Sequence, residues 1–372
     1  MQIGVPKEIK DHEYRVGITP SGVQALVRAG HYVRVQAGAG ARIGFSDETF
    51  RAAGASIAAD AAATYDGDLV VKVKEPQPSE YAFLKSGLTL FCYLHLAALP
   101  ELARELMSRG VQAIAYETVT DDAGGHPLLT PMSEVAGRLA LQAGAQALTL
   151  PYGGNGTLIS GVPGVAPARV AIIGSGTVGS NAAHIAVGLG ADVTLIGRSV
   201  EKLRYWETVF AGRLKTQFSS PDNIACIVQE SDLLIGAVYV PGKQPPKLLS
   251  RDLLASMRPG SALVDVSIDQ GGIAGTSRPT THSDPFYVEA GIVHYCVTNM
   301  PSATARTSTL ALTHVTLPYA LRLANLGWRA ALIEEVGLRA GLNVAEGQIT
   351  HDGLAEDLGL SAVSADTILQ TA

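Results

Sequence analysis

Two side chains that can transfer protons or stabilise charge directly follow apolar runs typical of buried strands. His95 follows the run 90–94, and Asp269 follows the run 262–268. An imidazole exchanges protons near neutral pH, and a carboxylate can stabilise positive charge that develops in a reaction. We therefore predict catalytic roles for His95 and Asp269. The alternatives are a structural histidine and an aspartate that accepts hydrogen bonds from the glycine turn after it.

Two cations occupy similar places in the first third of the chain. Arg15 lies in a polar loop before residues 16–20, and Lys74 ends the apolar run 69–73. Charged groups at successive strand ends can converge on one cleft, where an arginine and a lysine together suit a carboxylate substrate. We predict substrate-binding roles for Arg15 and Lys74. The alternative for each is a surface cation whose stem lies along apolar neighbours.

A glycine motif follows the apolar run 170–173 and opens a helical pattern over 181–189. Gly174 permits a tight turn, Gly176 lets the backbone approach a pyrophosphate, and Gly179 lets helix and strand pack closely. The helix N-terminus then offers free N–H groups to the phosphates. This context predicts a dinucleotide site, against the alternative of an ordinary glycine-rich turn.

The end of the second strand of this series carries no acidic residue. Dinucleotide sites for NAD usually have Asp or Glu there, bonded to the ribose hydroxyls. This chain instead has Gly197, Arg198 and Ser199, with Lys202 close behind. These residues suit a 2′-phosphate, so we predict that NADPH is accepted or preferred, with NADH as the alternative cofactor. A solvated basic turn that tolerates either cofactor is the competing interpretation.

The elements that position these residues form two series of alternating strands and helices, which indicates parallel sheets covered on both faces. We predict an α/β protein of two Rossmann-like domains, joined by two long helices at 133–150 and 309–326, with a cleft between the domains. The substrate domain is expected to comprise 1–130 and 307–372, and the dinucleotide domain 131–306. The predicted strands are 2–6, 32–36, 69–73, 88–94, 111–116, 169–173, 192–196, 214–218, 232–238, 261–267 and 292–298.

The composition argues against several classes of protein, including nucleic-acid-binding and membrane-spanning proteins. The 372 residues carry a net charge of −6, which argues against a nucleic-acid partner. No apolar run reaches the roughly 18 to 20 residues of a membrane span, and the first residues do not resemble a signal peptide. Cys92, Cys226 and Cys296 lie far apart in apolar stretches. We predict buried free thiols and a cytoplasmic location.

Several motifs occur in the order known from one family. They are residues 4–8, Arg15-Val16 with Thr19-Pro20, 71–76, 94–98, 115–119, 131–138, 161–165, 269–272 with 278–281, and 299–301. In these motifs the chain resembles the alanine dehydrogenase family, which includes the nucleotide-binding alpha subunit of proton-translocating transhydrogenase. The resemblance implies a homo-hexamer that interconverts L-alanine, water and NAD with pyruvate, ammonium and NADH.

The resemblance also assigns residues. It gives His95 and Asp269 the catalytic positions, and Arg15 and Lys74 the positions that bind the substrate carboxylate and carbonyl. Further dinucleotide contacts are expected beyond those already named, and they include the strand-end residues Val238 and Val266. The full set is Ser133, Val178, Ser219, Val238, Val266, Arg278, Val297, Asn299 and Met300.

The chain departs from the family at three places. Gly197 replaces the acidic residue, and residues 301–308 differ from the usual sequence after Asn299 and Met300. Glu117 matches a position associated with a divalent ion, but its histidine partner is Leu326 here, so we predict no functional metal. The competing functions are an oxidoreductase of the same fold acting on another 2-oxo acid and amine, a transhydrogenase-like subunit, and a dinucleotide sensor without turnover.

Overall fold

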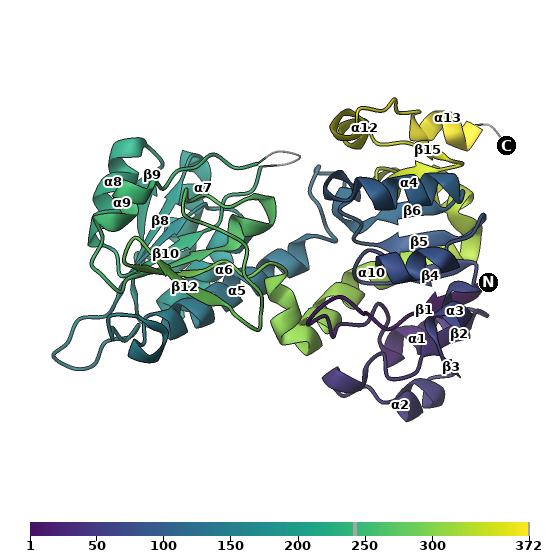
Figure 1. Ribbon diagram of the computed structural model, residues 1–372, viewed down its shortest axis with the longest axis horizontal. Coiled ribbons are helices and arrows are strands. Elements are labelled where there is room, and N and C mark those ends of the chain that lie inside the picture. Colours follow the sequence, from purple (N-terminus) through teal and green to yellow (C-terminus); the bar gives the residue numbers. More distant parts are fainter. Residues whose placement is uncertain (241–243, 371–372) are drawn as a thin grey trace. The chain divides into compact units, whose positions relative to one another are not determined.

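The structure, a computed structural model, describes residues 1–240 and 244–370, which form two compact units. Unit 1 comprises Met1–Met132 and Ser302–Ala372, and unit 2 comprises Ser133–Pro301. Each unit holds one β-sheet with helices packed on it (Figure 1). Both sheets are largely parallel, which confirms the predicted α/β class.

The sheet of unit 1 has eight strands in the order β15-β14-β6-β5-β4-β1-β2-β3. Six of them are parallel, and the hairpin β14–β15 adds two antiparallel strands at one edge. The strands are β1 (Gln2–Val5), β2 (Tyr32–Gln36), β3 (Ser56–Ala58), β4 (Leu69–Val71), β5 (Thr89–Cys92), β6 (Gln112–Ala115), β14 (Leu342–Ala345) and β15 (Gln348–Ile349).

Apolar faces hold the helices of unit 1 on this sheet. Alternate residues of β5 and β6 share one buried cluster with the inner face of α4 and with α12. The helices are α1 (Pro20–Arg28), η1 (Ala41–Ile43), α2 (Asp47–Ala52), α3 (Ala61–Tyr65), η2 (Pro78–Phe83), η3 (Leu96–Ala98), α4 (Pro100–Ser108), η4 (Tyr116–Thr118), α10 (Ala305–Glu334), α11 (Val336–Arg339), α12 (Asp352–Leu358) and α13 (Ala365–Gln370). The long α10 is interrupted at Gly327, whose φ is +76°.

The sheet of unit 2 has seven strands in the order β12-β13-β11-β10-β7-β8-β9, and only β12 is antiparallel to its neighbour. The strands are β7 (Arg169–Ile173), β8 (Asp192–Gly197), β9 (Lys215–Phe218), β10 (Leu233–Gly236), β11 (Ala262–Asp265), β12 (Phe286–Glu289) and β13 (Ile292–Tyr295). Successive strand residues belong to two different buried clusters, so both faces of this sheet are covered.

Helices of unit 2 contribute to both clusters. Alanines of α6 and the α5 residues 140–147 pack on one face, whereas α8 and α9 pack on the other. The helices are α5 (Thr130–Ala147), η5 (Leu150–Tyr152), α6 (Thr177–Gly188), α7 (Val200–Phe210), α8 (Pro221–Glu230), α9 (Arg251–Ala255), η6 (Val266–Gln270) and η7 (Met300–Thr304). Among the helices that the structure describes, none combines the length and apolar character needed to cross a membrane.

The parallel strands of both sheets follow the same order. Numbered along each series, the order is 3-2-1-4-5-6, in which the chain reverses direction across the sheet between the first and fourth strands. These two strands are β1 and β4 in unit 1, and β7 and β10 in unit 2. In open sheets of this kind, ligands bind beyond the carboxyl ends of the strands at that reversal point. The fold therefore marks one candidate site in each unit.

The antiparallel strands β12, β14 and β15 were not predicted. The hairpin β12–β13 turns at Ala290 and Gly291, and β14–β15 turns at Glu346 and Gly347, all with positive φ. Two successive positive φ values characterise the type I′ turn, which matches the twist of a hairpin. The strand β3 was also missed.

The three cysteines are free thiols, as predicted, but one prediction about them was wrong. Cys92 and Cys296 are buried in or beside strands, whereas Cys226 is exposed. Its segment forms the amphipathic helix α8, in which Ile224 and Val228 face the core. A helical period of 3.6 turns Cys226, midway between these residues, toward solvent.

Candidate active site

The glycine motif connects β7 to α6 and is packed tightly on one side. Gly174 has a φ of +122°, and a β-carbon there would lie 2.2 Å from the carbonyl oxygen of Ala237. A β-carbon at Gly179 would lie 1.8 Å from the carbonyl oxygen of Gly174. At Gly176, by contrast, a β-carbon would meet nothing within 4 Å. The loop therefore requires glycine for packing at two positions and leaves the third open.

The open side of the loop lies at the N-terminus of α6. Gly176 is the N-cap residue and offers no side chain to accept the first N–H groups of the helix. Uncapped N–H groups and the positive end of the helix dipole together favour an anion. This cradle fits the pyrophosphate of a dinucleotide.

The end of β8 shows why residue 197 is glycine in this chain. A β-carbon at Gly197 would lie 2.5 Å from Oγ of Ser175, which fills the space where an acidic side chain would begin. Arg198 and Lys202 are exposed. Ser199 caps α7, where its Oγ accepts a hydrogen bond from the N–H of Lys202 at 3.2 Å. The hydroxyl proton of Ser199 can still be donated to a ligand.

Three predicted residues make contacts beyond the strands of unit 2: Val238 with Ser267, and Asp269 with Asn299. The Ser267 hydroxyl donates to the carbonyl of Val238 at 2.8 Å and accepts from its N–H at 3.0 Å. Asp269 is exposed, and its Oδ1 accepts from the N–H of Asn299 at 3.3 Å. The loops after β10, β11 and β13 are thus connected at the same edge of the sheet.

A buried carboxylate next to these residues was missed in the sequence. Oδ2 of Asp265 accepts from the N–H of Ile273 at 2.8 Å, from the N–H of Ala274 at 3.4 Å and from the hydroxyl of Ser277 at 2.6 Å. Its Oδ1 is buried and has no hydrogen-bond partner within the described residues. Asp265, rather than Asp269, therefore anchors the glycine turn that follows β11.

The environment of Asp265 disfavours its charge. Burial raises the pKa of this carboxyl, although the hydrogen bonds from Ser277 and the two backbone N–H groups oppose the shift. Asp265 lies inside the apolar run 262–268, so the sequence predicted a strand residue at this position and not a site residue.

The other predicted cofactor contacts differ in their surroundings. Val297 and Met300 are buried in the core of unit 2, and Val178 and Val266 pack against it. The N–H of Ser219 donates to the carbonyl of Gly197 at 2.9 Å. The guanidinium of Arg278 lies 3.9 Å from the centre of the Tyr287 ring. Ser133 lies in α5, and no described contact connects it with the other predicted residues.

In unit 1, two predicted residues meet at the ends of neighbouring strands. Nζ of Lys74, beyond β4, lies 3.4 Å from Nε2 of His95, beyond β5. Lys74 is buried, whereas the side chain of His95 is 43% exposed. His95 adopts a left-handed backbone conformation with φ +50°, and its ring stacks parallel to that of Tyr93. The structure thus brings a cation and a proton-transfer group together at the edge where ligands are expected.

Arg15 is buried and already paired. Its Nε donates to Glu13 Oε1 at 2.7 Å, its Nη2 donates to Oε2 at 2.5 Å, and its Nη1 contacts the sulfur of Met132 at 3.0 Å. Only 2% of Arg15 is exposed. A substrate carboxylate would share this guanidinium with Glu13, a residue to which the sequence analysis gave no role.

Glu117 contacts the backbone of His95. Its carboxylate accepts hydrogen bonds from the backbone N–H groups of Leu94 and His95. The part of the chain that the structure describes contains no group of three or more His, Cys, Asp or Glu residues that could hold a metal ion.

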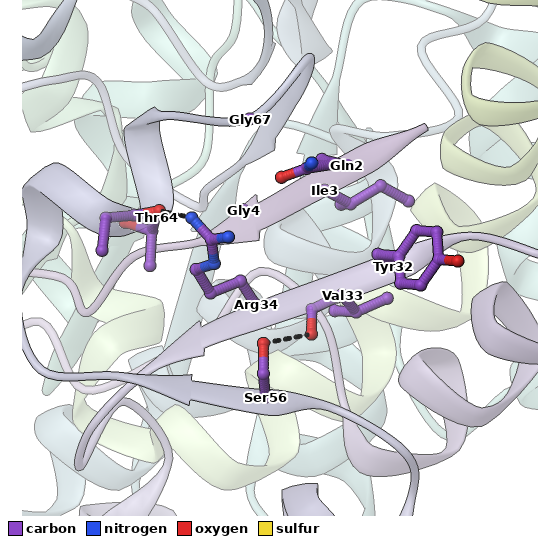
Figure 2. Close-up of a pocket in the computed structure, with 10 residues that line it drawn as sticks. Gln2, Ile3, Gly4, Tyr32, Val33, Arg34, Ser56, Thr64 and Gly67 are labelled. Carbon is purple, nitrogen blue, oxygen red and sulfur yellow. Dashed lines mark hydrogen bonds between the residues drawn. The ribbon is translucent and has the colours of Figure 1, made fainter.

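A cavity of about 150 Å³ in unit 1 lies away from these residues. It is lined by the amino-terminal ends of β1, β2 and β3, and Figure 2 shows Arg34 reaching toward the end of α3. Its guanidinium donates to the carbonyl of Ala63 at 2.6 Å. No predicted site residue lines this cavity, which lies at the opposite ends of the strands from Lys74.

Comparisons with known proteins bear on both units. Residues 4–136 match the family model "Alanine dehydrogenase/PNT, N-terminal domain", and residues 140–352 match "Alanine dehydrogenase/PNT, C-terminal domain". The chain belongs to the alanine dehydrogenase/PNT family. This confirms the predicted resemblance.

Relatives of this family match along their full length. An alanine dehydrogenase of Halomonas elongata is 55% identical over 99% of this chain and 100% of its own, and one of Bacillus subtilis is 54% identical over 100% and 98%. A solved L-alanine dehydrogenase structure, 48% identical, superposes with a TM-score of 0.94 over 96% of this chain and 99% of its own. A transhydrogenase from Sinorhizobium meliloti has a TM-score of 0.83 at 20% identity, which shows the shared fold alone.

Membership in the alanine dehydrogenase/PNT family, with alanine dehydrogenases as full-length relatives, implies an oxidoreductase that uses a nicotinamide dinucleotide and small-molecule substrates. The glycine cradle before α6 has the shape and free N–H groups for such a cofactor.

Proposed function

We propose that this protein is an L-alanine dehydrogenase. It catalyses the reversible conversion of L-alanine, water and NAD(P)⁺ to pyruvate, ammonium, NAD(P)H and a proton. The full-length relatives named alanine dehydrogenase support the substrate. The observation that carries the chemistry is the 3.4 Å contact between Lys74 and His95 at the ends of β4 and β5.

The chemistry requires a hydride acceptor and a proton shuttle. The bound dinucleotide supplies the acceptor for the hydride that leaves the α-carbon of alanine. His95 removes a proton from the water that adds to the resulting imine carbon, and it returns a proton to the nitrogen as ammonia leaves. Because an imidazole can both accept and donate a proton near neutral pH, one group can serve both steps.

The remaining residues bind and stabilise the substrate. Lys74 and Arg15 hold the carboxylate and polarise the carbonyl oxygen, which orients the reacting carbon. Asp269 stabilises the positive charge of the imine and orients the attacking water or ammonia. Its exposed carboxylate, bonded only weakly to Asn299 at 3.3 Å, is free to turn toward a cation.

For the cofactor, we propose that NADPH is used at least as well as NADH. The end of β8 supports this, because Ser175 occupies the space beside Gly197 where a repelling carboxylate would begin. Arg198, Ser199 and Lys202 offer donors for a 2′-phosphate at the same turn. Arg278 and Ser219 belong to the same proposed site, together with the residues predicted from the family.

The test is a reductive assay with purified protein. Pyruvate and ammonium should be consumed with oxidation of NADH or NADPH, and pyruvamide or methyl pyruvate should react at least about tenfold more slowly, because each lacks the charge that the cations bind. The rates with glyoxylate and 2-oxobutyrate, compared with the rate with pyruvate, show how well the enzyme accepts other 2-oxo acids. Equal rates with the uncharged compounds would refute carboxylate recognition, and no turnover with any 2-oxo acid would refute the proposed activity.

We further propose that the protein is a homo-hexamer, as the family resemblance implies, and that it is located in the cytoplasm. The three unpaired cysteines are compatible with a reducing compartment. Sedimentation equilibrium at several protein concentrations measures the assembly directly, and a mass of one or two chains would refute the hexamer.

A further inference from the structure

Two glutamates from separate segments of unit 1 hold the ends of β4 and β5. Glu8 follows β1, and its Oε1 accepts hydrogen bonds from the N–H groups of Val73 at 2.6 Å and Lys74 at 3.2 Å. These N–H groups belong to the segment that carries the Lys74 side chain. A carboxylate that accepts two backbone N–H groups restricts the segment more strongly than a neutral acceptor would.

Glu117 does the same for the next strand. It follows β6, and its carboxylate accepts from the N–H of Leu94 at 3.1 Å and from the N–H of His95 at 2.6 Å. The left-handed conformation of His95 is unfavourable for a non-glycine residue and persists only where surrounding contacts impose it. The two short contacts to Glu117 impose that conformation.

The charge of Glu8 is balanced inside the unit. Its Oε2 lies 3.2 Å from Nζ of Lys72, which is fully buried and also donates to Glu80 at 3.0 Å. Glu80 in turn accepts from the hydroxyl of Tyr65 and the N–H of Gln77. Glu80 therefore shares the buried ion cluster but does not contact the backbone of Lys74, which makes it the natural control residue.

We propose that Glu8 and Glu117 are positioning residues that set the spacing between Lys74 and His95. Each carboxylate fixes one strand end, so that the ammonium and imidazole nitrogens lie 3.4 Å apart in the resting protein. A displacement of about 1 Å in such a pair is enough to lower turnover substantially. The inference rests on the proposed catalytic function of His95 and Lys74.

The Glu8 test compares two variants in a Lys72→Met, Glu80→Gln background, which removes the buried cation together with its second carboxylate partner, so that a neutral residue 8 leaves no unpaired charge. Glu8→Gln retains an oxygen that accepts from the backbone, whereas Glu8→Leu does not. We expect KM for pyruvate to rise at least about tenfold in the Leu variant relative to the Gln variant, with KM for the dinucleotide unchanged. Glu80→Gln alone should leave KM for pyruvate unchanged even if it lowers the melting temperature.

The Glu117 test compares Glu117→Ala, Glu117→Gln and the control Thr118→Val. Thr118 is the residue next to Glu117, and the control removes its hydroxyl, which accepts a hydrogen bond from the side chain of Asn343. We expect Glu117→Ala to lower kcat at least about 30-fold with KM for the dinucleotide unchanged, because His95 loses its fixed conformation. The Gln variant should recover part of this loss through its remaining acceptor oxygen, and Thr118→Val should keep kcat. If the Ala variant does not fold, the Gln variant still must show a lower kcat than Thr118→Val.

The same assay separates the two levels of the inference. If His95→Ala and Lys74→Ala retain turnover, the proposed function itself is wrong. If these two variants lose turnover but the Leu variant at Glu8 and the Ala variant at Glu117 keep wild-type constants, only the positioning role is refuted. Equal losses in Glu80→Gln and Thr118→Val would also refute it, because general destabilisation would then explain the result.

Discussion

The ammonium nitrogen of Lys74 lies 3.4 Å from Nε2 of His95, and the two residues extend from parallel strands that pair directly. At this distance the neutral imidazole can accept a hydrogen bond from the ammonium group, whereas a second positive charge would be repelled. In the proposed mechanism, Lys74 carries the charge and His95 exchanges protons.

Replacing His95 by Asn should abolish proton transfer while retaining a side chain of similar size. We expect kcat to fall by about two to four orders of magnitude, with the dissociation constant of the dinucleotide unchanged because the glycine loop belongs to unit 2. Steady-state kinetics and calorimetric titration measure the two quantities. The control His31→Asn, which alters a surface contact with Asn325, should keep full activity; near-normal turnover in the His95 variant would remove His95 from the mechanism.

Replacing Asp269 by Asn should separate charge from local structure. The amide oxygen can still accept the N–H of Asn299, so the strand ends should keep their arrangement, but the negative charge is lost. We expect kcat to fall by about two to three orders of magnitude with little change in melting temperature. The exposed Asp284 provides a matched control, since Asp284→Asn should have no effect. A kcat within a few-fold of wild type would exclude Asp269 as the charge-stabilising group.

The cofactor preference should reverse only when Ser175 and Gly197 change together. Gly197→Asp alone forces its β-carbon to within 2.5 Å of the Ser175 hydroxyl, so we pair it with Ser175→Gly. The double variant should shift kcat/KM toward NADH by about tenfold or more, since a carboxylate repels the 2′-phosphate. Arg198→Ala should shift it in the same direction, and Arg204→Ala, further along α7, should not. A strict NADH preference in the unmodified protein would contradict the proposal.

Two glycines of the same motif should respond differently to alanine. At Gly179 the new β-carbon would meet the carbonyl oxygen of Gly174 at 1.8 Å, so the free energy of unfolding should fall by about 2 kcal/mol or more. At Gly176 the β-carbon enters open space, so stability should be retained while dinucleotide affinity falls at least about tenfold. Urea unfolding and calorimetric titration distinguish these outcomes. Unchanged affinity in Gly176→Ala would place the pyrophosphate elsewhere.

Stability should depend on pH through Asp265. Burial raises the pKa of this carboxyl in the folded state above its unfolded value of about 3.9, so the folded state binds the proton more tightly. Its contribution to stability is therefore present below that value and is lost as pH rises through the folded pKa. The difference in the free energy of unfolding between the wild type and Asp265→Asn should fall over this range. A difference that stays constant or grows with pH would refute the assignment.

The sequence predicted the parallel sheets and the glycine cradle because both depend on local patterns. Apolar runs identify buried strands, and the spacing of Gly174, Gly176 and Gly179 identifies the turn between them. It did not predict the roles of Glu8 and Ser175, because these depend on which backbone atoms lie opposite them in three dimensions. It also did not show that Arg15 is paired with Glu13, since a salt bridge across one residue has no distinctive pattern. Strand ends were thus predictable, and the carboxylates that hold them were not.

The strand order that the two sheets share has a further consequence for the size of the ligand that each unit can bind. At the reversal point of unit 2, the glycine loop and the N-terminus of α6 leave room for a large anion. At the equivalent point of unit 1, Glu8 follows β1 and forms an ion pair with Lys72, which follows β4. The turn after β1 runs through Pro6 and Lys7 to the buried pair of Glu8 and Lys72, and it has neither the glycine spacing nor the helix N-terminus that cradle a pyrophosphate. We therefore expect that the site in unit 2 accepts a dinucleotide, whereas the site in unit 1 accepts a ligand only a few atoms long.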